Sequence, residues 1–220
     1  MSERVEVRKT FKLYVGGAFP RSESGRSYAV HAAGRAGRDG AFLANAAMAS
    51  RKDARDAVVA ARAAQKGWAG ATAYNRGQVL YRVAEVMESR RAQLVQDVRD
   101  SEGLSPAAAE ATVSAAIDRW VWYAGWADKF TQVLGGLNPV AGPYFDISAP
   151  EATGVVAVLA PQRSSLLGLV SVVAPVIVSG NTAVVLTSED RPLPAITLAE
   201  CLATSDVPGG VVNLVTGRTG

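Results

Sequence analysis

The fold is decided by residues 154–186, which read GVVAVLAPQRSSLLGLVSVVAPVIVSGNTAVVL. A continuous apolar run rich in valine, residues 154–159, is typical of a strand that is covered on both faces. Residues 166–178 predict a buried helix, which ends at Gly180-Asn181, and residues 182–186 predict a second strand. A strand, a helix and a strand joined by short connections indicate a parallel pair with a right-handed crossover.

The same alternation continues to the end of the chain. Residues 192–202 predict a second helix, and residues 211–215 predict a third strand after the turn Pro208-Gly209-Gly210. The fold class is therefore α/β, with a Rossmann-like parallel β-α-β-α-β sheet. Such sheets bind ligands at the carboxyl ends of their strands, so the places to examine are residues 160–163, 187–190 and 216–220.

The region before this sheet is predicted to be mainly helical. Ser50 and Asp53 form a capping box before the apolar stripe of a helix that runs to Trp68. A second helix is expected from Tyr74 to Glu102-Gly103, and a third from Ser105-Pro106 to Gly135-Gly136. Residues 13–19 predict a short hairpin that turns at Gly16-Gly17, and residues 35–40 predict a loop.

The chain is thus expected to form a single domain with three parts. Residues 1–136 supply the N-terminal hairpin and helices, residues 137–152 supply projecting strands, and residues 153–220 supply the partial Rossmann-like sheet.

Composition narrows the functional classes. The 220 residues are 49% hydrophobic, 20% charged and 7% aromatic, which is typical of a globular protein. With one cysteine and one histidine, neither a disulfide within the chain nor a zinc site of Cys and His ligands is expected, so we predict no metal site. The net charge of +3 is spread among acidic residues, so no nucleic-acid partner is predicted. The charged N-terminus and the shortness of residues 166–178 predict a cytoplasmic protein with no membrane partner.

Two longer blocks of sequence resemble the aldehyde dehydrogenase superfamily. They are residues 174–185, APVIVSGNTAVV, and residues 207–217, VPGGVVNLVTG. Both occur in the order and at the separation that this family shows, and the segments LYVGG at 13–17 and YNRG at 74–77 are also similar to it. The resemblance covers nearly the whole chain, and it is greatest to the degenerate second domain of two-domain aldehyde dehydrogenases.

This resemblance implies oxidation of an aldehyde by NAD or NADP, through a cysteine thiolate and a general base. After the first strand, however, the family usually has Pro-Trp-Asn, with the Asn donating to the oxyanion, whereas this chain has Pro161-Gln162-Arg163. After the second strand the family usually has Lys-Pro-x-Glu, and the stretch LTSE at 186–189 keeps only Glu189. Glu189 is therefore the one residue assigned to cofactor binding. No bound cofactor is expected, and NAD or NADP is the expected one if any binds.

No catalytic residue is assigned. In the family, the nucleophilic cysteine and the general-base glutamate lie further along the chain than this sequence runs, so we expect the catalytic half to be lacking. Cys201 falls within the predicted helix 192–202 and is interpreted as a buried structural cysteine. His31 is interpreted as a loop or surface histidine.

Residues 144–147, Tyr-Phe-Asp-Ile, match in position the strands through which aldehyde dehydrogenase subunits associate. An alternating segment of this kind suits pairing with another chain. The predicted partner is a second copy of this chain or a full-length aldehyde dehydrogenase subunit.

Three functional hypotheses remain. The preferred one is a truncated aldehyde dehydrogenase-like protein that acts as a non-catalytic assembly or structural partner. The second is retained NAD(P)-dependent aldehyde dehydrogenase activity, either with a partner chain or as part of a longer enzyme. The third is a nucleotide-binding module that uses Glu189 and the loop at Gly217.

Overall fold

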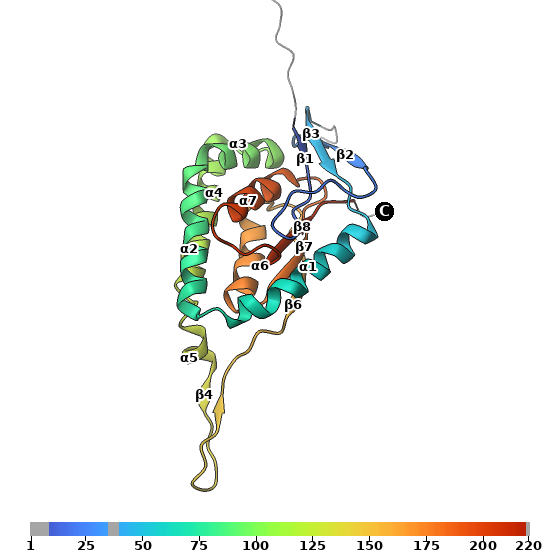
Figure 1. Ribbon diagram of the computed structural model, residues 1–220. Coiled ribbons are helices and arrows are strands. Elements are labelled where there is room, and N and C mark those ends of the chain that lie inside the picture. Colours follow the sequence, from blue (N-terminus) through green and yellow to red (C-terminus); the bar gives the residue numbers. More distant parts are fainter. Residues whose placement is uncertain (1–8, 35–39, 219–220) are drawn as a thin grey trace, which may run out of the picture.

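The computed structural model describes residues 9–34 and 40–218 (Figure 1). Most of the predicted loop at 35–40 lies outside the described residues. The N-terminal part forms a three-stranded sheet in the order β1-β3-β2, made of β1 (Thr10–Phe11), β2 (Ser27–His31) and β3 (Phe42–Ala47). β3 pairs parallel to β1 and antiparallel to β2. The sequence had predicted only the hairpin at 13–19 in this region.

That hairpin is confirmed. Val15 and Ala18 exchange backbone hydrogen bonds of 3.0 and 3.1 Å, and the turn between them has φ values of +62° at Gly16 and +84° at Gly17. Glycine adopts positive φ at little cost, so the Gly16-Gly17 pair fits this turn. The hairpin is joined to the C-terminal strand, because Tyr14 and Leu214 also exchange two backbone hydrogen bonds.

The helical region has more breaks than the sequence predicted. α1 (Arg51–Gly70) begins with the predicted capping box of Ser50 and Asp53. The expected second helix is two helices, α2 (Ala73–Ser89) and α3 (Arg91–Glu102), which meet at Arg90. The expected third helix ends early: α4 (Pro106–Ala124) is followed by turns and then by the short α5 (Phe130–Leu134).

The physical reason for the missed breaks is that the apolar pattern continues through them. Arg90 has φ −109° and ψ 16°, outside the helical region, yet Met87 before it and Leu94 after it are both fully buried. A change of direction that keeps both apolar faces inside the core leaves no trace in the hydrophobic periodicity.

The predicted parallel sheet is confirmed. β6 (Val155–Leu159), α6 (Leu167–Val178), β7 (Thr182–Leu186), α7 (Leu193–Ala203) and β8 (Val212–Val215) follow one another along the chain, and the sheet order is β6-β7-β8 with both pairs parallel. Val184 and Leu186 pack with Ala57 of α1, whereas Ala183 and Val185 belong to the larger core that contains α6 and α7. Alternate residues of a strand point to opposite faces, so α1 lies on one face of the sheet and α6 and α7 on the other.

One expectation about the sheet is wrong. The run at 154–159 was predicted to be covered on both faces, but β6 lies at an edge, and Ala157 and Leu159 are exposed. Leu159 keeps 79% of its surface accessible to solvent. The apolar sequence predicts burial of both faces, whereas the structure leaves one face of β6 exposed at Ala157 and Leu159.

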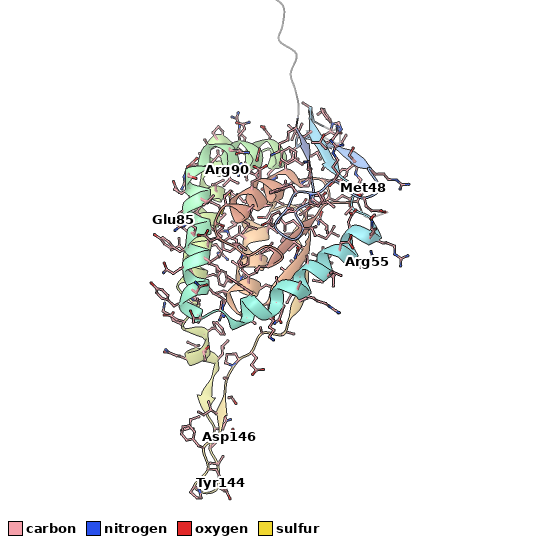
Figure 2. The ribbon with its side chains drawn as sticks, viewed as in Figure 1. Met48, Arg55, Glu85, Arg90, Tyr144 and Asp146 are labelled. Atoms are coloured by element: carbon pink, nitrogen blue, oxygen red, sulfur yellow. The ribbon has the colours of Figure 1, made fainter. Side chains whose placement is uncertain are left out.

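A thin arm projects from the body of the molecule (Figure 1). It contains β4 (Gly136–Leu137) and β5 (Ile147–Ser148), which pair antiparallel. Tyr144 and Asp146 lie toward the tip of the arm (Figure 2).

In the described part of the chain, no helix is long and apolar enough to cross a membrane.

Candidate functional site

The loops that follow β6 and β7 are tied together at the carboxyl edge of the sheet. The side-chain amide of Gln162 donates to the carbonyl of Ala160 at 3.0 Å and accepts from the backbone N–H of Glu189 at 2.9 Å. The Ser188 hydroxyl donates to the Gln162 carbonyl at 2.8 Å. Gln162 therefore joins the two loops by hydrogen bonds, a role that the sequence does not predict.

Arg163 stands where the family resemblance placed a short amide donor. Arg163 is exposed, and its backbone carbonyl accepts a 2.8 Å hydrogen bond from the guanidinium of Arg191. This hydrogen bond joins the loops that follow β6 and β7 through the backbone of Arg163.

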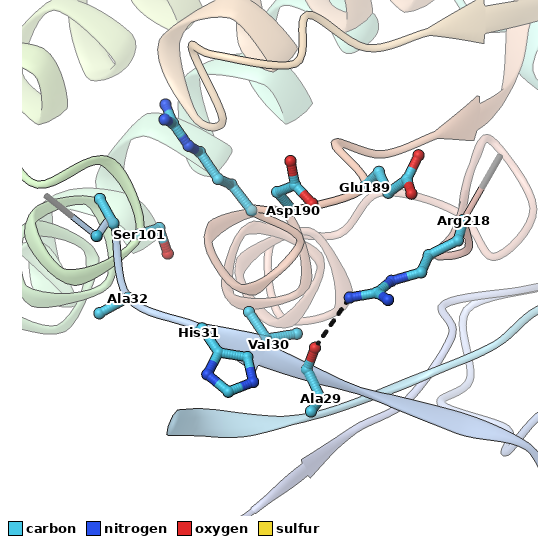
Figure 3. A pocket seen from close by; sticks show the side chains of 11 residues that line it. Ala29, Val30, His31, Ala32, Ser101, Glu189, Asp190 and Arg218 are labelled. Carbon is cyan, nitrogen blue, oxygen red and sulfur yellow. Dashed lines mark hydrogen bonds between the residues drawn. The ribbon is translucent and has the colours of Figure 1, made fainter. Parts of the chain in front are cut away.

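A pocket of about 230 Å³ lies between strand β2 and the loops that follow β7 and β8 (Figure 3). Its charged lining consists of Glu189, Asp190, Arg191 and Arg218. Ser101 also lines it, and within the described residues the buried hydroxyl of Ser101 has no hydrogen-bond partner. The pocket therefore offers two carboxylates, two guanidinium groups and one unpartnered hydroxyl.

Arg218 connects the loop after β8 to strand β2. Its guanidinium lies 5.2 Å from the centre of the Tyr28 ring and 3.5 Å from the carbonyl oxygen of Ala29. Burial raises the pKa of Tyr28, and the nearby charge of Arg218 partly offsets this rise. Glu189 and Arg218 both lie in strand-end loops that the sequence predicts to face a ligand, at 187–190 and 216–220. The sequence does not predict β2, so it gives no indication that Tyr28 and Ala29 lie against the Arg218 loop.

Cys201 is fully buried in α7, as the sequence analysis interpreted it. Burial raises the pKa of its thiol to about 11, and the neighbouring Arg90 charge only partly opposes this effect. A thiol in this environment stays protonated at neutral pH and is a poor nucleophile.

His31 is the last residue of β2, whereas the sequence predicts a loop or surface position for it. Its ring centre is 6.0 Å from that of Phe42, and its Nδ1 atom is 3.2 Å from the carbonyl oxygen of Gly40. His31 is half-buried rather than exposed. Over residues 9–34 and 40–218, no group of three or more His, Cys, Asp or Glu side chains is arranged to hold a metal ion.

A three-stranded parallel sheet with helices on both faces, and with a pocket beside its strand-end loops, defines the chain as a Rossmann-like α/β protein. The profile of the Aldehyde dehydrogenase family matches residues 26–220. The chain therefore belongs to the aldehyde dehydrogenase family.

Individual relatives agree with this assignment. The chain is 30% identical over 218 residues to human retinal dehydrogenase 2, a match that covers 97% of the chain and 40% of that protein. It is 28% identical over 222 residues to mouse cytosolic 10-formyltetrahydrofolate dehydrogenase, covering 98% of the chain and 24% of that protein.

Solved structures give the same result. An NAD⁺ complex of an aldehyde dehydrogenase from Bacillus cereus superposes with a TM-score of 0.88 at 27% identity, over 96% of this chain and 42% of that one. An NAD-dependent aldehyde dehydrogenase from Sinorhizobium meliloti superposes with a TM-score of 0.89 at 26% identity, over 96% and 42%. The chain thus spans less than half the length of these relatives.

The pocket beside β2 is too small to enclose a whole dinucleotide. Pockets that enclose small organic ligands are typically about 300–1,000 Å³, and NAD is larger than most such ligands. The pocket here is about 230 Å³, and the backbone of Glu189, which lines it, is bonded to Gln162. Glu189 can accept from ribose hydroxyls and Arg218 can face a phosphate, so the site suits at most part of a dinucleotide. We derive no hydride-transfer step from it.

Proposed function

We propose that this chain is a non-catalytic assembly module of the aldehyde dehydrogenase family, located in the cytoplasm. It associates through its arm, residues 137–152, with a full-length aldehyde dehydrogenase subunit or with a second copy of itself. The observation that carries the proposal is the apolar surface of this arm. Its large side chains are exposed by 65% at Leu137, 74% at Tyr144, 80% at Phe145 and 58% at Ile147.

The arm is also organised for binding. The Asn138 side-chain amide donates to the Asp146 carboxylate at 3.2 Å and to the Ser148 hydroxyl at 3.0 Å, and the Asn138 backbone N–H donates to the Asp146 carbonyl at 2.8 Å. These cross-strand bonds hold the two sides of the arm together. A pre-organised apolar segment loses less conformational entropy on association than a flexible one.

Two observations support the absence of catalysis. Arg163 replaces the short amide that the family usually has at the next position. The thiol of Cys201 is buried and its pKa is raised, so it is not an activated nucleophile.

The assembly role can be tested by light scattering. A double variant, Tyr144→Ser with Phe145→Ser, is expected to shift the purified protein, alone or with a full-length aldehyde dehydrogenase, to a smaller species. Val59→Ser is the matched control, because Val59 is also apolar and 60% exposed but lies in α1. An unchanged mass for the arm variant would contradict association through this arm. Oxidation of an aldehyde by the purified chain with NAD or NADP, above the rate in buffer, would contradict the absence of catalysis.

A second candidate is a nucleotide-binding module, which the charged pocket and the unpartnered Ser101 hydroxyl favour. Calorimetry with NAD, NADP and ADP-ribose separates the two candidates. The assembly role predicts no heat of binding for any of them, whereas the binding role predicts heat that Glu189→Gln and Arg218→Gln each reduce. Retained dehydrogenase activity with a partner chain is the remaining alternative, and it predicts turnover only when that partner is added.

A further inference from the structure

A pocket in the N-terminal sheet is lined by basic side chains. It has a volume of about 220 Å³ and lies beside β1, the last residue of β3 and the turn that leads into β2. Three of its lining residues are basic and three carry a hydroxyl group: Lys12, Arg21 and Arg26, and Thr10, Ser22 and Ser27. Among the described residues that line it, none carries a carboxylate. The pocket is therefore electropositive, and its sheet lies at the opposite end of the molecule from the arm (Figure 1).

The turn that forms one wall of this pocket is held in place by hydrogen bonds. The Gly25 N–H donates to the Ser22 carbonyl at 2.9 Å, and the buried Ser22 hydroxyl donates to the Asp53 carboxylate at 2.8 Å. On the other side, Ser27 pairs in register with Ala47, whose short side chain leaves space beside the strands. A binding site that is already ordered loses less conformational entropy when a ligand binds.

The basic side chains of the pocket have no partner of their own. Within residues 9–34 and 40–218, no side-chain ion pair or hydrogen bond is formed by Lys12, Arg21 or Arg26. The carboxylates next to the turn are already engaged, since Glu23 pairs with Lys52 at 3.3 Å and Asp53 accepts three hydrogen bonds. Charges of one sign gathered around a cavity raise the local concentration of ions of the opposite sign. The pocket is thus suited to an anion.

We propose that this pocket binds the phosphate group of a small phosphate monoester. Such a group carries between about −1.5 and −2 charges at neutral pH, which three cationic side chains match better than they match the single charge of a carboxylate. Arginine presents paired N–H donors to phosphate oxygens, and lysine adds a point charge. The hydroxyls of Thr10 and Ser27 supply two further donors at the same pocket.

The size and place of the pocket limit what binds there. Pockets that enclose a drug-sized ligand are typically about 300–1,000 Å³, so 220 Å³ suits a small phosphate ester rather than a large molecule. It shares no lining residue with the pocket between β2 and the loops that follow β7 and β8. The inference therefore rests neither on the proposed assembly function nor on a nucleotide at that other pocket.

The test is calorimetry of the purified chain with glycerol 3-phosphate as the probe, and with acetate at the same ionic strength for comparison. Arg21→Gln and Arg26→Gln each remove one charge from the pocket. Arg62→Gln is the matched control, because Arg62 is also an exposed arginine but lies in α1 and does not line the pocket. Urea unfolding of each variant verifies that it folds.

The affinity for glycerol 3-phosphate is expected to fall by at least about tenfold in Arg21→Gln and in Arg26→Gln, because each loses a charge-assisted hydrogen bond, and to be kept in Arg62→Gln. It should also weaken as potassium chloride is added. Three results would overturn the proposal: no heat of binding, equal affinity in Arg26→Gln and Arg62→Gln, or binding of acetate as tight as that of glycerol 3-phosphate.

A second measurement separates a soluble phosphate ester from the phosphate of a lipid. The chain is floated with vesicles that contain phosphatidic acid, in the presence and absence of glycerol 3-phosphate. The proposal predicts no flotation, or flotation that glycerol 3-phosphate abolishes. Flotation that persists at saturating glycerol 3-phosphate and is lost in Arg26→Gln would assign the pocket to a lipid surface and overturn the proposal.

Discussion

The hydroxyl of Thr197 in α7 donates to the Asp97 carboxylate in α3 at 2.6 Å, and this bond joins two helices that are 100 residues apart in the chain. Desolvation raises the pKa of Asp97, although the Thr197 bond and the Lys9 charge oppose the rise. The folded protein therefore holds a proton on Asp97 more tightly than the unfolded chain does. Below the unfolded pKa this group favours the folded state, and that contribution is lost as the pH rises through the folded pKa.

Asp97→Asn should remove this pH dependence, because the amide keeps an acceptor for Thr197 and cannot ionise. Relative to the parent protein, we expect its free energy of unfolding to increase from mildly acidic to neutral pH, by about 1 kcal/mol. Urea unfolding at both pH values measures the difference. Asp118→Asn, at an exposed position of α4, is the control. If the difference in free energy of unfolding between Asp97→Asn and the parent protein stays constant with pH, burial does not raise the pKa of Asp97.

The contribution of Asp53 to stability is expected to change with pH in the opposite direction to that of Asp97. Burial alone would raise its pKa, but hydrogen bonds from the Ser50 N–H at 2.7 Å, the Ser22 hydroxyl at 2.8 Å and the Glu23 N–H at 3.1 Å outweigh burial and lower it. Its stabilising contribution is thus present above the unfolded pKa and is lost as the pH falls through the folded pKa. Asp53→Ala should cost about 2 kcal/mol at neutral pH and clearly less in acid, by urea unfolding. An equal loss at both pH values would show that the carboxylate charge does not contribute.

Much of this arrangement follows from local sequence. The capping box at Ser50, the turn at Gly16-Gly17 and the parallel sheet were predicted because each depends on residues close in the chain. The capping interaction also extends beyond the box, since Ser22 and Glu23 bond Asp53 across about thirty residues of sequence. Such long-range partners have no periodic pattern that a sequence reading could detect.

The candidate site shows the same limit. Glu189 was identified because it follows a predicted strand, whereas Arg218 reaches the pocket only because β8 and the hairpin bring its loop beside β2. The edge position of β6 was also not predicted. The composition of a strand indicates how buried it can be, but its place in the sheet depends on which other strands pair with it.

Cys201 should be unreactive in the folded protein. Its pKa is raised to about 11 by burial, and its side chain is fully buried, so neither a thiolate nor access is available at neutral pH. We expect labelling by iodoacetamide to be slower by at least about a hundredfold in buffer than in guanidinium chloride, followed by mass spectrometry. Rapid labelling of the folded protein would contradict a structural role for this cysteine and would reopen its candidacy as a nucleophile.

The turn of the N-terminal hairpin provides the last prediction. Gly17 has φ +84°, and a Cβ atom added there would lie 2.9 Å from the Cα atom of Gly209, in the turn before β8. Gly25 has a similar φ of +67° but nothing within 4 Å of such an atom. Gly25→Ala should therefore cost only the backbone conformation, about 1 kcal/mol, whereas Gly17→Ala should cost about 3 kcal/mol because it also separates the hairpin from the sheet. Urea unfolding of the two variants measures the difference. Equal losses would mean that the close approach of Gly17 and Gly209 does not stabilise the fold.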